Sequence, residues 1–405
     1  MKNTRPGLTD KRYALPFVLI TSLFFLWGFA RAILDVLNKH LQNEMGISLS
    51  QSSLIQVTTY LGYFLMAIPA GLYINRKGYR HGVVLGLLLF ALGALMFIPG
   101  ESIGTFSAFL LALFIIGCGL VFLETAANPY VTELGPAQTA TSRLNFSQSF
   151  NGLGSLFATF AVGQFFFSDS SSGGSVAVPY AILGVIVLGI ALVFSRAQLP
   201  EIKYEAASDE GLRGSRIAEL LKEHPMFVFG LLALLCYEVA EISINSYFIN
   251  FVTGKGWMSD SLASIVLTCA LAFFMVGRFG GSWIMRSVKP ERMLLWCAAG
   301  TVLCMGLVLL DLGVVSMVAL VGTYLFEAVM FPTIFALALQ GLGGLTKTAA
   351  SLLMMTPIGG CGFLLMGLIA DATDLVLPFF IPFAGYATVL FYAATFIRNG
   401  RKRAA

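Results

Sequence analysis

Long apolar stretches alternate with short polar ones along the whole chain. Stretches of about 20 apolar residues, the length that crosses a hydrocarbon core as a helix, recur throughout. They cover residues 14–38, 52–74, 80–99, 104–130, 143–167, 177–196, 226–252, 259–285, 290–310, 313–340, 349–371 and 375–397. This pattern predicts an all-α membrane protein with twelve transmembrane helices.

The composition agrees with a chain that lies in a lipid bilayer. It is 57% hydrophobic and only 11% charged, whereas soluble domains carry roughly 25% charged residues. The net charge of +4 comes from loop residues and gives no reason to expect nucleic-acid binding. The six cysteines lie in apolar segments without a metal-like spacing, so we expect no metal site.

A long polar insertion divides the apolar segments into two groups of six. It covers residues 197–225 and carries most of the charged residues of the middle of the chain. We therefore expect an N-terminal six-helix bundle over residues 1–196, a linker over 197–225 and a C-terminal six-helix bundle over 226–405.

The basic residues predict the orientation in the membrane. If both termini are cytoplasmic, all of the 25 Lys and Arg except Arg31, Lys39, Lys255 and Arg278 fall in the termini or in cytoplasmic loops. This is the positive-inside pattern. We expect a multi-pass protein of a bacterial inner membrane, with both termini and the linker in the cytoplasm.

The two halves repeat three motifs. Glu124 precedes Pro129 by five residues, and Glu327 precedes Pro332 by the same spacing. The other matches are Gly71 and Arg76 with Gly281 and Arg286, and Gly152 and Gly154 with Gly360 and Gly362. Such matches indicate a duplicated six-helix unit, and two repeats around a midplane site are the architecture of alternating-access carriers.

Glu124 is a carboxyl group inside an apolar segment. Placing an ionised carboxylate at membrane depth costs at least about 2.5 to 3.5 kcal/mol, so such residues mark functional sites. Desolvated carboxyl groups bind protons at higher pH than exposed ones, which makes Glu124 the expected proton carrier. Asn128 lies one turn further on the same face as its hydrogen-bonding neighbour. The alternative is a structural hydrogen bond from Glu124 to another helix.

Asp35 differs from Glu124 because Arg31 precedes it by four residues, the spacing at which helix side chains meet. We hypothesise that Asp35 accepts hydrogen bonds from a substrate and alternates between Arg31 and that substrate. A static buried ion pair between Arg31 and Asp35 is the alternative.

Polar stripes at helical spacing predict a binding site for a polar substrate, since such a site needs several hydrogen-bonding groups. The stripes consist of Asn145, Gln148 and Asn151; Gln56, Tyr60 and Tyr63; and Glu238, Glu241 and Asn245. Alternatively, the side chains of each stripe form hydrogen bonds to neighbouring helices. Trp27 is a candidate for stacking on a substrate ring, with an interfacial anchor as the alternative.

Several strings resemble known transporters. The loop Gly71-Leu-Tyr-Ile-Asn75-Arg76-Lys77-Gly78 resembles a loop of the major facilitator superfamily, with Asn75 in place of its usual acid. The strings Leu23-Phe-Phe-Leu-Trp27-Gly28-Phe29, Leu123-Glu124-Thr-Ala-Ala-Asn128-Pro129 and Arg143-Leu-Asn145-Phe-Ser-Gln148-Ser-Phe-Asn151 are similar to the L-fucose:proton symporter family. That family also includes glucose/galactose and N-acetylglucosamine permeases.

The resemblance covers the whole chain and implies twelve helices, a central sugar site and proton coupling. In it, Asp35 and Glu124 match the family's two functional carboxylates. The polar stripes and Trp27 are then expected to contact the sugar, and Asp35 to accept hydrogen bonds from its hydroxyl groups. The run Ala30-Arg31-Ala32-Ile33-Leu34 departs from the asparagine-rich fucose permease pattern, so the identity of the sugar does not transfer.

These observations predict a proton-coupled monosaccharide symporter for L-fucose or a related hexose such as glucose or galactose, or for N-acetylglucosamine. The expected partners are the sugar, protons and the lipid bilayer, with H⁺ as coupling ion, no cofactor and a monomeric state. A drug/proton antiporter and a membrane sugar sensor that does not transport are the alternatives. An enzyme would need a nucleophile or metal constellation, and the sequence offers none.

Overall fold

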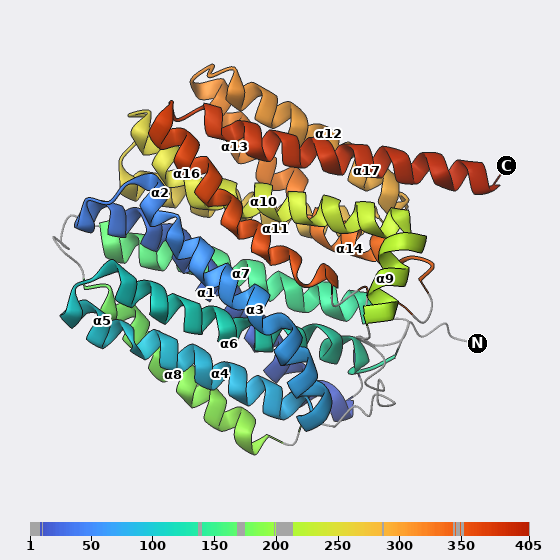
Figure 1. Cartoon of the computed structure of the whole chain (residues 1–405), viewed down its shortest axis with the longest axis horizontal. Coiled ribbons are helices and arrows are strands. Elements are labelled where there is room, and N and C mark those ends of the chain that lie inside the picture. The colour runs from blue at the N-terminus through green and yellow to red at the C-terminus, as the bar shows by residue number, and fades with distance from the viewer. Residues whose placement is uncertain are drawn as a thin grey trace. The chain divides into compact units, whose positions relative to one another are not determined.

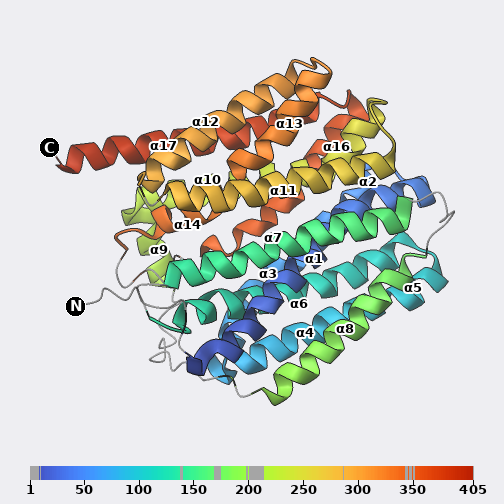
Figure 2. The same cartoon turned by 180° about the vertical axis from the view of Figure 1, so that it is seen from behind.

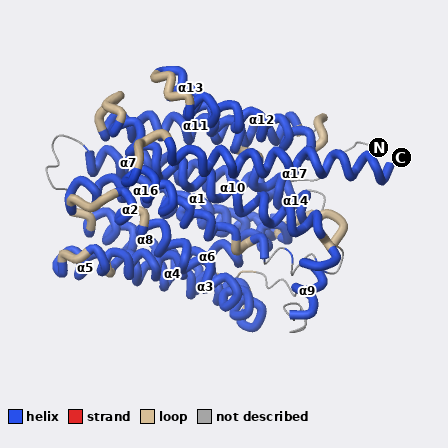
Figure 3. Tube along the Cα trace, turned by 45° about the horizontal axis from the view of Figure 1, so that its top comes forward, coloured by secondary structure: helices blue, strands red, loops and turns tan. Residues whose placement is uncertain are grey.

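A computed structural model describes residues 9, 11–136, 140–167, 175–197, 199, 214–285, 287–342, 345, 349 and 352–404. Within these ranges the chain is helical with short connections, and Figure 3 draws no strand. The α-helices are α1 (Ala14–Met45), α2 (Leu49–Ser52), α3 (Leu54–Lys77), α4 (Tyr79–Leu95), α5 (Phe97–Ile103), α6 (Phe106–Glu133), α7 (Ala140–Phe167), α8 (Ala177–Arg196), α9 (Gly214–Glu223), α10 (Pro225–Gly254), α11 (Asp260–Ile284), α12 (Pro290–Leu309), α13 (Val314–Glu327), α14 (Met330–Leu339), α16 (Gly362–Ala372) and α17 (Phe380–Ala404). Three short 3₁₀ helices are η1 (Lys11–Tyr13), η5 (Thr356–Cys361) and η6 (Leu377–Phe379).

The helices account for the predicted apolar segments. Ten helical stretches of the described chain are long and apolar enough to cross a membrane. The predicted segment 143–167 corresponds to α7, which is not among these ten; its polar residues Asn145, Gln148 and Asn151 lower its hydropathy. The predicted segment 349–371 corresponds to the shorter apolar stretch Thr356–Ala372. Residues 198 and 200–213 of the predicted linker lie outside the described ranges.

One compact unit contains the described residues of Met1–Ile33, Leu61–Ala158 and Ser172–Ala207. Within it α4 packs along α6 and α8, an arrangement that can be followed in Figure 2. A methyl group added to Gly86 would lie 2.8 Å from the carbonyl oxygen of Gly119, and one added to Gly119 would lie 2.6 Å from that of Gly86. Small residues at such crossings let transmembrane backbones approach closely.

The second compact unit contains the described residues of Leu34–Tyr60, Thr159–Ser171 and Ser208–Ala405. In it α10 packs against α11, α14, α16 and α17, and α2 packs against α16; Figure 1 shows α10 and α17 side by side. The final part of α1, the first part of α3 and the end of α7 thus belong with the C-terminal helices.

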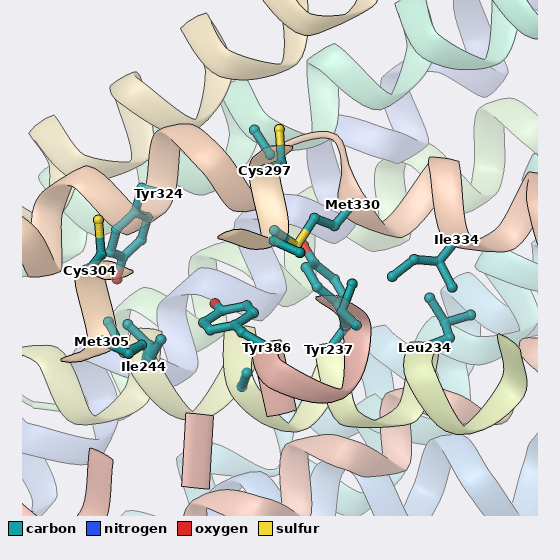
Figure 4. Packing of buried hydrophobic residues seen from close by; sticks show 14 of the residues in the cluster. Leu234, Tyr237, Ile244, Cys297, Cys304, Met305, Tyr324, Met330, Ile334 and Tyr386 are labelled. Carbon is teal, nitrogen blue, oxygen red and sulfur yellow. The ribbon is translucent and has the colours of Figure 1, made fainter. Parts of the chain in front are cut away.

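Tyrosines are unusually deep in the core of this second unit. Those with no more than 1% of their surface exposed are Tyr237, Tyr247, Tyr324, Tyr386 and Tyr392. Figure 4 shows Tyr237, Tyr324 and Tyr386 among apolar side chains such as Met330 and Ile244. A buried phenol brings a hydroxyl group that needs a hydrogen-bonding partner. This core therefore contains polar hydroxyl groups among its apolar side chains.

The predicted segment 313–340 is a broken helix, because α13 ends at Glu327 and α14 begins at Met330. Pro332 explains the break, since proline has no N–H to donate to the carbonyl four residues earlier, that of Ala328. Two side chains bond the carbonyls at the break. The Nε of Arg278 donates to the Ala328 oxygen at 3.1 Å, and the hydroxyl of Tyr237 donates to the Glu327 backbone oxygen at 3.3 Å.

Candidate functional site

Glu124 is buried in the first unit, with 7% of its surface exposed. It lies in the middle of α6, and its helix neighbours Leu123, Ala126 and Ala127 are fully buried. The guanidinium of Arg31, on α1, is within electrostatic range of the Glu124 carboxyl group. A carboxyl group in this setting can hold a proton away from bulk water. That Glu124 carries the coupling proton remains a prediction.

Two amides predicted to contact sugar meet one turn from Glu124. The Nε2 of Gln148, on α7, donates a hydrogen bond to the Oδ1 of Asn128, on α6, at 3.2 Å. Each amide keeps further donor and acceptor positions, so the pair can still bind hydroxyl groups. Asn145 lies on the same helix as Gln148, but its side chain is outside the described residues.

Asn151 and Trp27 lie where α7 crosses α1. The Nδ2 of Asn151 donates to the carbonyl oxygen of Phe24 at 3.4 Å, and the hydroxyl of Ser155 donates to that of Gly28 at 3.0 Å. Trp27 is 2% exposed and its ring lies 5.3 Å from that of Phe24. Among the described residues, the indole N–H of Trp27 has no hydrogen-bond partner. Buried polar groups are nearly always bonded, so this donor is available to a ligand.

In the second unit Asp35 belongs to a buried hydrogen-bond network. Its Oδ1 accepts a hydrogen bond from the hydroxyl of Ser246, on α10, at 2.7 Å. Ser246 accepts one from the Nε2 of Gln56 at 3.0 Å, and the Oε1 of Gln56 accepts one from the Nδ2 of Asn38 at 3.2 Å. Gln56 therefore bonds two other helices through both ends of its amide, so in this arrangement it serves as an interhelical bond.

Three further predicted residues lie in the second unit. The ring of Tyr60 packs on the backbone of Gly360, where an added methyl group would lie 2.2 Å from a ring carbon. Glu241 and Asn245 follow one another by a turn on α10 and are partly exposed. Within the described chain, the Oδ1 of Asn245 is buried without a hydrogen-bond partner.

Arg31 and Asp35 lie one turn apart on α1, as their spacing requires. Their pairing, whether static or switching, remains a prediction. Arg31 belongs to the same compact unit as Glu124, whereas Asp35 belongs to the unit that contains Ser246 and Gln56. The contribution of Arg31 to the surroundings of Glu124 was not anticipated from the sequence, because the two residues are far apart along the chain.

The sequence interpretation missed Ser246, Asn38, Gln42 and Ser52. Gln42 donates to the Oδ1 of Asn38 at 2.6 Å and to the hydroxyl of Ser52 at 2.7 Å. A signal was present: Asp35, Asn38 and Gln42 follow the i, i+3, i+7 spacing of one helix face. Among the described residues, no group of three or more His, Cys, Asp or Glu side chains is placed to hold a metal ion.

Comparisons with known proteins agree with this architecture. The sequence profile of the Major Facilitator Superfamily matches residues 20–360. A glucose/galactose transporter of Brucella abortus (strain 9-941) is 33% identical over 393 residues, which are 95% of this chain and 94% of that protein. An L-fucose-proton symporter of Escherichia coli (strain K12) is 34% identical over 417 residues, covering 96% of this chain and 93% of that protein.

Solved structures have the same fold. The crystal structure of a Major Facilitator Superfamily transporter, FucP, in the outward conformation matches with a TM-score of 0.75 at 32% identity, over 95% of this chain and 99% of that one. The xylose transporter XylE from E. coli, partially occluded and inward open, matches in fold with a TM-score of 0.73 at 14% identity, over 94% and 98% of the two chains. The chain is therefore a transporter rather than an enzyme, and it belongs to the Major Facilitator Superfamily, in the family of sugar permeases that contains L-fucose-proton symporters and glucose/galactose transporters.

Proposed function

We propose that this protein imports a monosaccharide together with protons by alternating access. The observation that carries the proposal is Glu124, a buried carboxyl group one turn from the Asn128 and Gln148 amide pair. It lies in a chain that is 33% to 34% identical over nearly its whole length to named hexose transporters. The substrate is L-fucose or a related hexose, such as glucose or galactose, or N-acetylglucosamine.

Sugar recognition is assigned to side chains that can exchange hydrogen bonds with hydroxyl groups. Amides both donate and accept, which suits Asn128, Gln148 and Asn151, and Asn145 is proposed as a further sugar contact from its sequence position alone. The indole N–H of Trp27, which has no partner in the described part of the chain, adds a donor beside an aromatic ring. Gln56, Tyr60, Glu241 and Asn245, which belong to the second unit, are assigned as further sugar contacts.

Coupling is assigned to two carboxyl groups. Glu124 carries the proton, and Asp35 accepts hydrogen bonds from sugar hydroxyls and alternates between substrate and Arg31. The bond from the Ser246 hydroxyl to Asp35 supports this role, because a sugar hydroxyl can replace a serine hydroxyl as donor to the same carboxylate. H⁺ is the only coupling ion proposed, and no cofactor takes part.

The proposal includes the setting of the protein in the membrane. The two six-helix bundles are residues 1–196 and 226–405, joined by a cytoplasmic linker over 197–225. Both termini lie in the cytoplasm of a bacterium, the membrane is the inner membrane, and the working unit is a monomer.

Uptake into proteoliposomes tests this function. We expect labelled fucose, galactose, glucose or N-acetylglucosamine to accumulate under an inward proton gradient and to lose that accumulation when a protonophore is added. Sugar accumulation that is unchanged by the protonophore contradicts proton symport. Binding of sugar without accumulation would indicate a sensor, and proton-driven efflux of hydrophobic drugs would indicate an antiporter.

Alternating access requires contacts that open and close, and one such set joins α1 to α11 in the second unit. The Nδ2 of Asn43 donates to the Oδ2 of Asp260 at 2.8 Å, and the Nζ of Lys39 lies 3.8 Å from the Oδ1 of Asp260. Contacts of this partly exposed kind are worth about 0.2 to 1 kcal/mol each. They can therefore be broken in every transport cycle.

Cross-linking this contact is expected to stop transport. In a Cys269→Ser background, which removes the exposed native thiol, we expect Asn43→Cys combined with Asp260→Cys to lose sugar uptake when a short, cleavable thiol cross-linker is added. A reducing agent should restore the uptake. The two single-cysteine variants are the controls and should remain active. Full uptake by a completely cross-linked protein would mean that α1 and α11 do not part during the cycle.

A further inference from the structure

Glu327 is a second deeply buried carboxyl group, with 1% of its surface exposed. It is the last residue of α13, directly before the helix break. The hydroxyl of Tyr386, on α17, donates a hydrogen bond to its Oε2. Figure 4 shows Tyr386 and Tyr237 close to each other in this core. The coupling scheme proposed above gives Glu327 no role.

The region around Glu327 carries excess negative charge when all of its carboxyl groups are ionised. Several titratable or charged groups act on Glu327 or on the tyrosines around it: Asp35 of α1, Tyr237, Glu238 and Glu241 of α10, Arg278 of α11, Cys304 of α12, Tyr324 of α13 and Tyr386 of α17. Among the described residues, the carboxyl groups in this cluster, Asp35, Glu238, Glu241 and Glu327, outnumber its one cation, Arg278. Excess charge is costly in a buried site, and a proton taken from water by Glu327 lowers it.

The Tyr386 hydroxyl can hold Glu327 in both protonation states. It donates to the carboxylate when Glu327 is ionised. A hydroxyl also has acceptor lone pairs, so after a rotation it can accept the O–H of the protonated carboxyl group. The carboxyl group can therefore gain or lose a proton without losing its partner.

The helix break links the charge of Glu327 to neighbouring helices. Arg278 acts on the Glu327 carboxyl group and also donates to the Ala328 carbonyl oxygen. Tyr237 donates to the backbone oxygen of Glu327 itself. A change of charge on this side chain therefore acts on residues that join α10 and α11 to the break. On the same helix α10, Ser246 donates to Asp35.

We propose that Glu327, held by Tyr386 and placed at the α13–α14 break, is a second proton-binding site of this transporter. Proton binding there lowers the excess negative charge of the cluster and biases how α10 and α11 pack around the break. Its coupling to sugar rests on the proposed symport function, whereas proton binding itself does not. The five-residue spacing to Pro332, matched by Glu124 and Pro129, makes it the counterpart of Glu124 in the other repeat.

Infrared difference spectroscopy of the full-length protein in lipid, titrated with pH in the absence of sugar, tests the site. We expect a protonated-carboxyl band that is lost in Glu327→Gln and kept in Glu291→Gln, a control in the first turn of α12. Tyr386→Phe should shift the frequency of this band because it removes the hydrogen-bond partner. Tyr392→Phe, a buried tyrosine on the same helix whose hydroxyl has no partner among the described residues, should leave it in place.

The inference is overturned if Glu327→Gln leaves every carboxyl band of the wild-type spectrum intact. If that variant does not fold, Tyr386→Phe decides: unchanged carboxyl bands overturn the inference equally. Sugar-driven proton uptake by the wild type is measured in parallel. Its absence would contradict the proposed symport but not the proton site, whereas intact symport without a Glu327 band would contradict the proton site alone.

Discussion

Replacing Glu124 with glutamine is expected to abolish sugar-driven proton uptake while sugar exchange across the membrane continues. Glutamine has nearly the size of glutamate and keeps a hydrogen-bonding carbonyl oxygen, so packing within α6 changes little. It cannot gain or lose a proton, so a carrier that relies on this group can no longer convert a proton gradient into sugar accumulation. Exchange of labelled for unlabelled sugar needs no net proton movement and should survive.

The measurement compares two assays on the same proteoliposomes. External pH is recorded after sugar addition, and counterflow of labelled sugar is recorded without a gradient. Glu133→Gln is the matched control, because Glu133 is an exposed carboxyl at the end of the same helix and should behave as wild type. Undiminished proton uptake in Glu124→Gln would remove Glu124 from the coupling mechanism.

The helical architecture was largely predictable because membrane helices must bond their own backbone within each segment. Uninterrupted apolar length therefore reports a spanning helix. Two helical segments departed from a simple apolar span, and each has a local cause. The amides that lower the hydropathy of α7 are the same residues that predicted a sugar site. The break between α13 and α14 follows from Pro332, which can be seen in the sequence. The residues that bond the carbonyl oxygens at the break, Arg278 and Tyr237, come from other helices and could not be predicted from it.

The candidate site was predictable only along single helices. Spacing placed Gln148 and Asn151 on one stripe of α7, and the structure adds that Gln148 bonds to Asn128 of α6. Spacing could not assign partners between helices. Gln56 was open to two interpretations, and its bonds to Asn38 and Ser246 come from residues 18 and 190 positions away in sequence. Such pairings depend on packing, and no local pattern encodes them.

Replacing Gly28 with alanine is expected to destabilise the first unit severely and to reduce transport with it. A methyl group on Gly28 would lie 2.0 Å from the backbone oxygen of Asn151, so α1 and α7 would have to move apart. Alanine favours an isolated helix over glycine by about 1 kcal/mol. Forcing extra atoms into a packed core typically costs about 1 to 3 kcal/mol. Here the clash is with backbone, which cannot rotate away, so the packing cost should exceed the helix gain.

The variant Gly189→Ala separates the gain in helix propensity from the cost of the clash. Gly189 lies on α8, and nothing is within 4 Å of its added methyl group, so this variant receives the helix gain without the clash. In thermal unfolding of purified protein, we expect Gly189→Ala to match or exceed the wild type and Gly28→Ala to unfold at clearly lower temperature. A Gly28→Ala protein as stable as Gly189→Ala would mean that α1 and α7 do not approach as closely as the bond from Ser155 to Gly28 requires. The placement of Asn151 beside Trp27 would then have to be revised as well.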